Sequence, residues 1–129
     1  MKIAIAVTSD FAKVSGHAGR ARRWLVFEAA DPANIPAPHR IELEGEMVFH
    51  HFGDGGPHPL DGAEIILAAS AGDGFLKHMD KRGIEVVLTG ETDPAKAVAD
   101  FLGDRLAAPK ARPIGSLICK TLDLFSKHK

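Results

Sequence analysis

Short apolar runs alternate with polar stretches rich in glycine and proline along most of the chain. Runs of this length, rich in valine and isoleucine and bounded by turn residues, predict strands rather than helices. Within residues 40–44 polar and apolar positions alternate, which indicates a strand with one face in water. The predicted strands cover residues 3–7, 24–29, 40–44, 63–68 and 84–88.

Two segments with helical periodicity follow the last two strands. The first covers residues 72–82, and Gly83 stands where a glycine commonly ends a helix. The second begins at Thr92-Asp93-Pro94, because proline suits the first turn of a helix. The apolar faces consist of Phe75, Leu76 and Met79 in the first helix and Ala97, Val98, Phe101 and Leu102 in the second.

The order of these elements predicts an α/β fold. Strand, helix, strand and helix follow one another between residues 63 and 106, which favours parallel strands joined by a right-handed crossover. The first three strands have shorter links that fit a meander, so we expect a mixed five-stranded sheet with flanking helices. A chain of 129 residues suits a single domain, here residues 1–106.

Residues 107–129 are predicted to form a linker and a C-terminal amphipathic helix. Two prolines mark the linker over residues 107–113. The helix could dock on its own domain or on a partner, and a homo-oligomer is one outcome. Its apolar face would consist of Ile114, Leu117, Ile118, Leu122 and Phe125.

Composition excludes several classes of protein. Hydrophobic residues make up 45% and charged residues 26%, which is ordinary for a globular domain. The formal net charge of -1 gives no support for non-specific nucleic-acid binding. No apolar run approaches the length that spans a bilayer, and the start lacks the pattern of a signal peptide. We therefore expect a soluble, cytoplasmic protein with no membrane partner.

Cys119 is the only cysteine, so no intramolecular disulfide or all-cysteine metal site can form within one chain. A buried hydrophobic role for it is favoured over a thiolate ligand.

Histidines are concentrated in residues 50–62, a glycine-rich loop without apolar periodicity. His50, His51 and His58 could form a transition-metal site, with Asp54 or Asp61 as a further ligand. Neighbouring residues on an extended backbone point to opposite faces, so His50 and His51 can share an ion only if the loop bends. The alternative is a loop whose histidines bind nothing.

A second candidate site lies in the loop over residues 11–22. Gly16 and Gly19 flank His17, and glycines let a backbone approach a large ligand closely. Arg20 follows, and its guanidinium suits anionic groups on a ligand. Imidazole is a good ligand for iron, nickel, copper and zinc. The alternative is a surface histidine in a solvated basic loop.

The segment Val14-Ser15-Gly16-His17-Ala18-Gly19-Arg20-Ala21, the strand that opens the chain and the two later strand–helix units resemble the dinitrogenase iron-molybdenum cofactor biosynthesis family. The resemblance spans residues 1–106. Ala18 departs from it, since an aromatic residue usually follows the histidine, and the glycine-rich turn appears as residues 70–74.

This resemblance implies a ribonuclease-H-like sheet and a protein that binds and carries, or helps insert, a metal–sulfur cluster. The iron-molybdenum cofactor or a precursor would be the cargo, and nitrogenase assembly proteins would be the partners. His17, Gly16, Gly19 and Arg20 would contact it. We expect a carrier rather than an enzyme.

Two alternatives remain at this stage. One is a small protein-interaction or transition-metal-binding module unrelated to nitrogen fixation. The other is a two-metal nuclease, which needs converging carboxylates and is disfavoured by the charge balance. Gly72-Asp73-Gly74 could bind an anion but lacks a phosphate-loop lysine, so a turn is the favoured role. The carboxylates for a nuclease would be Asp10, Glu28, Glu44, Asp61 and Asp73.

Overall fold

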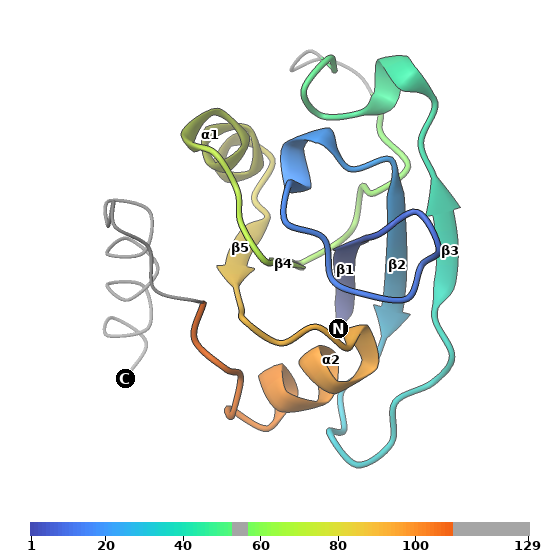
Figure 1. The fold of residues 1–129 in the computed structure, drawn as a ribbon, viewed down its shortest axis with the longest axis vertical. Coiled ribbons are helices and arrows are strands. Elements are labelled where there is room, and N and C mark those ends of the chain that lie inside the picture. The colour runs from blue at the N-terminus through green and yellow to red at the C-terminus, as the bar shows by residue number, and fades with distance from the viewer. Residues whose placement is uncertain (53–56, 110–129) are drawn as a thin grey trace.

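A twisted sheet forms the centre of the protein, and a computed structural model describes it over residues 1–52 and 57–109. The strands lie in the order β3-β2-β1-β4-β5, so the strand that opens the chain is in the middle (Figure 1). The strand bounds are β1 Lys2–Val7, β2 Arg23–Glu28, β3 His39–Glu42, β4 Ile65–Ala68 and β5 Glu85–Leu88.

The sheet is mixed. β1 pairs antiparallel with β2, and β2 pairs antiparallel with β3. β1 pairs parallel with β4, and β4 pairs parallel with β5. Only β2 therefore runs against the other four strands. The predicted fold class, a mixed five-stranded sheet of ribonuclease-H-like type in a single α/β domain, is confirmed.

Alternation along β1 divides the core into two parts. Ile3 and Ile5 are fully buried on the face covered by α2, Pro94–Leu102. Ala4 and Ala6 are fully buried on the other face, where α1, Asp73–Lys81, packs. Figure 1 shows the two helices apart, each against its own face of the sheet. The predicted apolar faces of both helices are confirmed.

The two helices begin differently. The Asp93 carboxylate caps α2 by accepting hydrogen bonds from the backbone N–H groups of Ala95 and Lys96 (3.1 and 3.5 Å). Gly72 precedes α1 and offers no side chain to cap it. At the other end of α1, Gly83 has φ of +74°, a conformation that glycine adopts without strain.

Two 3-10 turns, Ala18–Arg20 (η1) and Gly45–Met47 (η2), lie where no regular element was predicted. The predicted C-terminal helix and Cys119 fall outside the described residues. Within the part of the chain that the structure covers, no helix is long and apolar enough to cross a membrane.

Candidate functional site

The loop that carries His17 lies across the carboxyl ends of two parallel strands. The Ser15 N–H donates to the carbonyl oxygen of Ala6 at the end of β1 (2.8 Å), and the Ala69 N–H, just after β4, donates to the Ser15 carbonyl (3.0 Å). The Ala18 N–H then donates to the Ser70 carbonyl (3.3 Å). Ligands of open α/β sheets commonly bind outside such strand ends.

An open cavity of about 480 Å³ lies at this edge, and we call it the His17 pocket. The loop over residues 16–20, the start of α1 and one residue of the later histidine-rich loop contribute to its walls. Its lining residues are Gly16, His17, Gly19, Arg20, His50, Ser70, Ala71, Gly72, Gly74 and Phe75.

His50 reaches the His17 pocket because a backbone hydrogen bond joins the two loops. The His50 N–H donates to the Gly19 carbonyl oxygen at 2.6 Å. The chain then turns, since the N–H groups of His51 and Phe52 both donate to the Val48 carbonyl (2.8 and 2.9 Å). His17 and the histidine-rich loop therefore come together through His50.

His51 lies beside His50 but does not line the His17 pocket. The two imidazole centroids are 4.9 Å apart and the rings are nearly perpendicular, at 75°. The bend that a shared ion would require is therefore present. His51 lines a neighbouring cavity of about 380 Å³, which also contains His50 and Arg20. Both histidines are exposed.

His58 has different surroundings from those expected of a metal ligand. Its side chain is buried and stacks on Phe49, with ring centroids 4.2 Å apart and an interplanar angle of 18°. Nε2 lies 2.7 Å from the Met47 carbonyl oxygen, and Nδ1 accepts from the Leu60 N–H at 3.1 Å. As placed, neither ring nitrogen of His58 is left for an ion.

The tautomer of His58 follows from these partners. Because Nδ1 accepts a hydrogen bond, Nε2 carries the proton and donates to the Met47 carbonyl. Burial lowers the pKa of His58 below its ordinary value, although the hydrogen bond to Met47 acts in the opposite direction. The neutral ring is thus the form that the fold selects.

Asp61 and Arg82 fix the base of the histidine-rich loop. The Asp61 carboxylate accepts from the His58 N–H (2.8 Å) and pairs with the Arg82 guanidinium (2.5 Å). The hydrogen bond from Arg82 is the main reason that the pKa of Asp61 lies below its usual value. The Arg82 guanidinium also lies over the Phe52 ring, 5.5 Å from its centroid.

The four glycines of the His17 pocket are not required by the fold. A β-carbon at Gly72 or Gly74 would meet nothing within 4 Å, and one at Gly16 or Gly19 would make only ordinary contacts, at 3.8 and 3.6 Å. None of the four has positive φ. By contrast, Gly62 and Gly83 have positive φ, and Gly103 would crowd the Ala99 carbonyl at 3.3 Å. The pocket glycines keep space open on the side that faces solvent.

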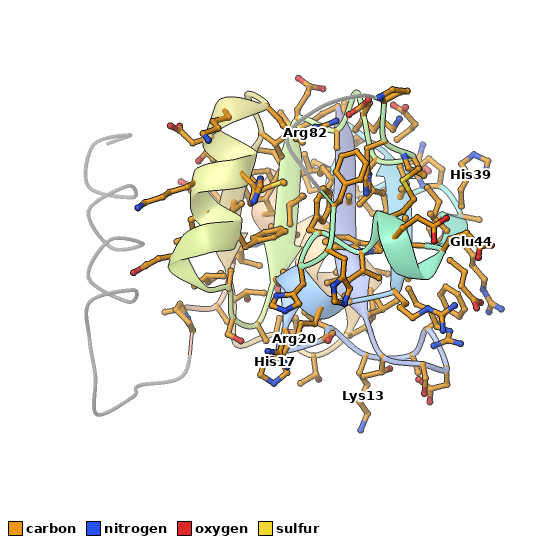
Figure 2. All side chains as sticks on the ribbon, turned by 90° about the horizontal axis from the view of Figure 1, so that it is seen from above. Lys13, His17, Arg20, His39, Glu44 and Arg82 are labelled. Atoms are coloured by element: carbon orange, nitrogen blue, oxygen red, sulfur yellow. The ribbon has the colours of Figure 1, made fainter. Side chains whose placement is uncertain are left out.

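One cationic side chain, Arg20, and the backbone at the start of α1 contribute to the His17 pocket. Arg20 lies beside His17, apart from His39 and Arg82 (Figure 2). The first turn of α1, without a side-chain cap, contributes backbone N–H groups and the positive end of the helix dipole. The arrangement suits a large anionic ligand whose metal atoms can be coordinated by imidazole nitrogens.

Nothing in the described residues assembles a conventional site for a single ion. No group of three or more histidine, cysteine, aspartate or glutamate side chains there could hold a metal. Two of the carboxylates considered for a nuclease are used locally: Asp10 accepts from the Thr8 hydroxyl (2.6 Å) and the Ala12 N–H (3.0 Å), and Asp61 pairs with Arg82.

One wall of the His17 pocket consists of residues that the sequence pattern does not mark as a site. Gly72 and Gly74 stand at the predicted start of the helix, as expected, but they also line the cavity, where only a turn role was favoured. Phe75 contributes an aromatic surface to the cavity, whereas Ala18, where the family usually has an aromatic residue, has no ring and is fully buried. The available signal was the Gly-Asp-Gly sequence between a strand and a helix. The complete set of residues missed is Ser70, Ala71, Gly72, Gly74 and Phe75.

Comparison with known proteins agrees with the fold and the motif. The family model described as dinitrogenase iron-molybdenum cofactor matches residues 1–104. No curated protein gives a significant match.

Several solved structures have a similar fold. The protein PH0822 has 23% identity and a TM-score of 0.63, over 82% of this chain and 92% of that one. A provisionally named dinitrogenase, MJ0327, from Methanocaldococcus jannaschii has 18% identity and a TM-score of 0.60, over 83% and 92%. A provisionally named NifB protein from Thermotoga, TM1290, has 18% identity and a TM-score of 0.56, over 88% and 98%. At these identities the likeness concerns the fold alone.

Proposed function

The chain belongs to the dinitrogenase iron-molybdenum cofactor family, and on that basis we propose that it binds a metal–sulfur cluster in the His17 pocket and carries it or helps insert it. The cargo would be the iron-molybdenum cofactor or a precursor. Its partners would be nitrogenase assembly proteins in the cytoplasm. The protein would act as a carrier and not as an enzyme.

The observation that carries this proposal is the meeting of His17 and His50 in one open cavity. They come from loops far apart in the sequence, joined by the hydrogen bond between the His50 N–H and the Gly19 carbonyl. Imidazole nitrogens bind iron and similar metals well when they are neutral. Arg20 and the start of α1 would interact favourably with the negative charge of such a cluster.

The pocket favours a preassembled cluster over a single ion. A tetrahedral zinc site normally has four ligands, or three and a water molecule, and the described residues offer only two imidazoles here. A cluster already carries sulfide ligands on its metals and needs few from the protein. Glycines on the solvent side leave room for an object of this size.

Cluster binding tests the proposal directly. The metal-free protein is incubated under anaerobic conditions with isolated iron-molybdenum cofactor, separated by gel filtration and analysed for iron and molybdenum per chain. We expect His17→Ala and His50→Ala each to weaken binding by roughly tenfold or more, as expected for loss of a group that holds a metal.

A matched control is available at His39. This histidine is also exposed but lies on the edge strand β3, away from His17 (Figure 2). His39→Ala should bind the cluster as the unaltered protein does. Equal binding by the His17, His50 and His39 variants would remove the His17 pocket as the cargo site, whatever the total amount bound.

A further inference from the structure

A second cavity, beside the His17 pocket, is lined by several cationic and imidazole side chains. It has a volume of about 380 Å³ and shares Arg20 and His50 with the His17 pocket. Its other lining residues are Arg22, Gly45, Val48 and His51. We call it the Arg22 pocket. Its walls therefore contain two guanidinium groups and two imidazoles, and no carboxylate among the described residues.

The fold holds the Arg22 side chain in position at this pocket. Its Nε–H donates to the Leu43 carbonyl oxygen at 3.2 Å, while the Leu43 N–H donates to the Arg22 carbonyl at 2.7 Å. An arginine fixed through Nε still has donors at the end of its fork. Because the group is already oriented, less conformational entropy is lost when it binds an oxyanion.

Acidic groups near the Arg22 pocket offset part of its charge, but none of them is among its lining residues. The Glu42 carboxylate lies 3.7 Å from Arg22 and 3.4 Å from Arg23, so one negative charge faces two positive ones. Among the described residues Arg20 has no ion-pair partner. Glu44, which precedes Gly45, lies well apart from Arg20 in Figure 2.

The space in the Arg22 pocket also faces outward. A β-carbon at Gly45 would meet nothing within 4 Å, and the φ of Gly45 is not positive. As in the His17 pocket, neither packing nor backbone conformation of this chain requires a glycine there. The absence of a side chain leaves the guanidinium of Arg22 and the ring of His51 accessible to a ligand.

We propose that the Arg22 pocket binds a small multivalent oxyanion, either a polycarboxylate or a tetrahedral oxyanion. Guanidinium forks pair with both kinds of oxygen geometry, and the imidazoles add further N–H donors. Two cationic groups lining one cavity favour a ligand with more than one negative charge. The inference needs no cluster in the His17 pocket and can be tested without one.

The test is a titration of the metal-free, ¹⁵N-labelled full chain at constant ionic strength. Tricarballylate, which lacks the hydroxyl that makes citrate a strong chelator, represents the polycarboxylates. Sulfate represents the tetrahedral oxyanions, and chloride is the monovalent control. We expect saturable shifts of the backbone amides of Arg22, Gly45 and His51 with at least one multivalent anion and none with chloride.

Three variants separate this pocket from its surroundings. Arg22→Gln should weaken binding of the anion by roughly tenfold, because a charge-assisted hydrogen bond is lost. Lys13→Gln removes the same charge outside both pockets and should have no such effect. His17→Ala, which disrupts only the His17 pocket, should also leave anion binding intact.

The pattern of results identifies the ligand class or rejects the site. Saturable binding of tricarballylate alone identifies a polycarboxylate pocket, and saturable binding of sulfate identifies a tetrahedral-oxyanion pocket. Shifts that follow ionic strength without saturation, or an Arg22→Gln variant that binds normally, overturn the proposal. If the spectrum shows that Arg22→Gln is unfolded, His51→Ala carries the same test, with a loss of several-fold expected.

Discussion

Burial and hydrogen bonding give the histidines of the 50–62 loop different roles. His58 is 5% exposed, stacked on Phe49 and bonded through both ring nitrogens, whereas His50 and His51 are exposed. The ring of His58 satisfies the Met47 carbonyl and the Leu60 N–H, which would otherwise lack partners inside the loop. His58 therefore orders the loop that brings His50 to the His17 pocket.

Replacing His58 should destabilise the protein. His58→Ala removes a buried ring and leaves two backbone groups unpaired, so we expect the free energy of unfolding to fall by about 2–4 kcal/mol. His51→Ala, in the same loop but exposed, should change it by less than about 0.5 kcal/mol. Urea denaturation followed by circular dichroism measures both. Equal effects at the two positions would contradict the structural role of His58.

The lowered pKa of His58 also predicts a pH dependence of stability. In the unfolded chain this ring takes up a proton near its ordinary pKa of 6.5, whereas in the fold it stays neutral to a lower pH. The unfolded state therefore binds more protons as the pH falls below about 6.5, and the free energy of unfolding decreases there. Above that pH the contribution is fully present.

Comparing the protein with His58→Gln isolates this effect. Glutamine can accept from the Leu60 N–H and donate to Met47, but it does not titrate. Denaturation at pH 8, 6 and 5 should show a smaller loss of stability for the variant than for the original chain. Asp61, whose pKa is depressed by Arg82, stays charged over this range. Parallel curves for the two proteins would show that His58 does not titrate as argued.

For individual residues, the sequence could identify candidate ligands but not how deeply each side chain is buried. His17, His50 and Arg20 were candidates because of residue type and flanking glycines, and all three line the His17 pocket. The burial of His58 could not be foreseen, because its stacking partner Phe49 and its acceptor on Met47 are set by how the loop folds back.

Among the elements, the two helices differ in how the backbone N–H groups of their first turn are hydrogen-bonded. Asp93 caps α2 with its own carboxylate, while Gly72 leaves the first turn of α1 without a side-chain cap. That uncapped turn lines the His17 pocket. Four N–H groups at the start of a helix lack intrahelical partners, so a ligand there can supply acceptors that α1 does not supply itself.

Substitutions at Gly72 test the charge requirement of the pocket. Its φ and ψ of -81° and 165° suit a capping side chain, and a β-carbon there meets nothing within 4 Å. Gly72→Asp and Gly72→Asn should both stabilise the fold by a few tenths of a kcal/mol. Only the aspartate adds negative charge, so we expect it to bind the cluster about threefold to tenfold more weakly than the asparagine variant.

Cluster titrations of the two variants side by side provide the measurement, with thermal unfolding as the check on folding. Identical affinities for the aspartate and asparagine variants would mean that the cargo does not sense charge at the start of α1.

Regular elements were more predictable than the turns between them. The five strands, the first helix and the start of the second helix lie within two residues of the expected positions, since period-two and helical patterns record burial directly. Both 3-10 turns were missed, because Ala18–Arg20 and Gly45–Met47 are stabilised by contacts with other segments and carry no periodic pattern. Those turns provide Gly19, Arg20 and Gly45. Residue type and spacing had marked Gly19 and Arg20 as candidates, whereas nothing in the sequence pattern marked Gly45.

For the molecule as a whole, the central strand buries side chains of different size on the two faces of the sheet. The α2 face is closed by large aliphatic side chains of the central strand, Ile3 and Ile5. On the α1 face the same strand presents Ala4 and Ala6, and bulk comes from Trp24 and Phe75. The pocket-forming loops belong to this second face. Among the described residues, both core clusters lie between Ile3 and Leu106.

Because the family model matches residues 1–104, removing residues 110–129 should leave the domain folded. We expect the truncated chain to unfold in a single cooperative transition with a free energy within about 1 kcal/mol of the full chain. Light scattering on the two proteins reports whether the removed segment mediates self-association, as its apolar pattern suggests. An unfolded or strongly destabilised truncated chain would mean that this segment completes the core.

The glycines around the His17 pocket limit how this opening can change during evolution. Every substitution of a glycine adds atoms, so mutation at Gly16, Gly19, Gly72 and Gly74 can only narrow the opening. Because the chain itself would accommodate a β-carbon at each of them, folding does not oppose that drift. In a lineage whose protein no longer bound its ligand, substitutions would gradually fill the opening. Retention of all four glycines among descendants would therefore indicate that the opening is still used.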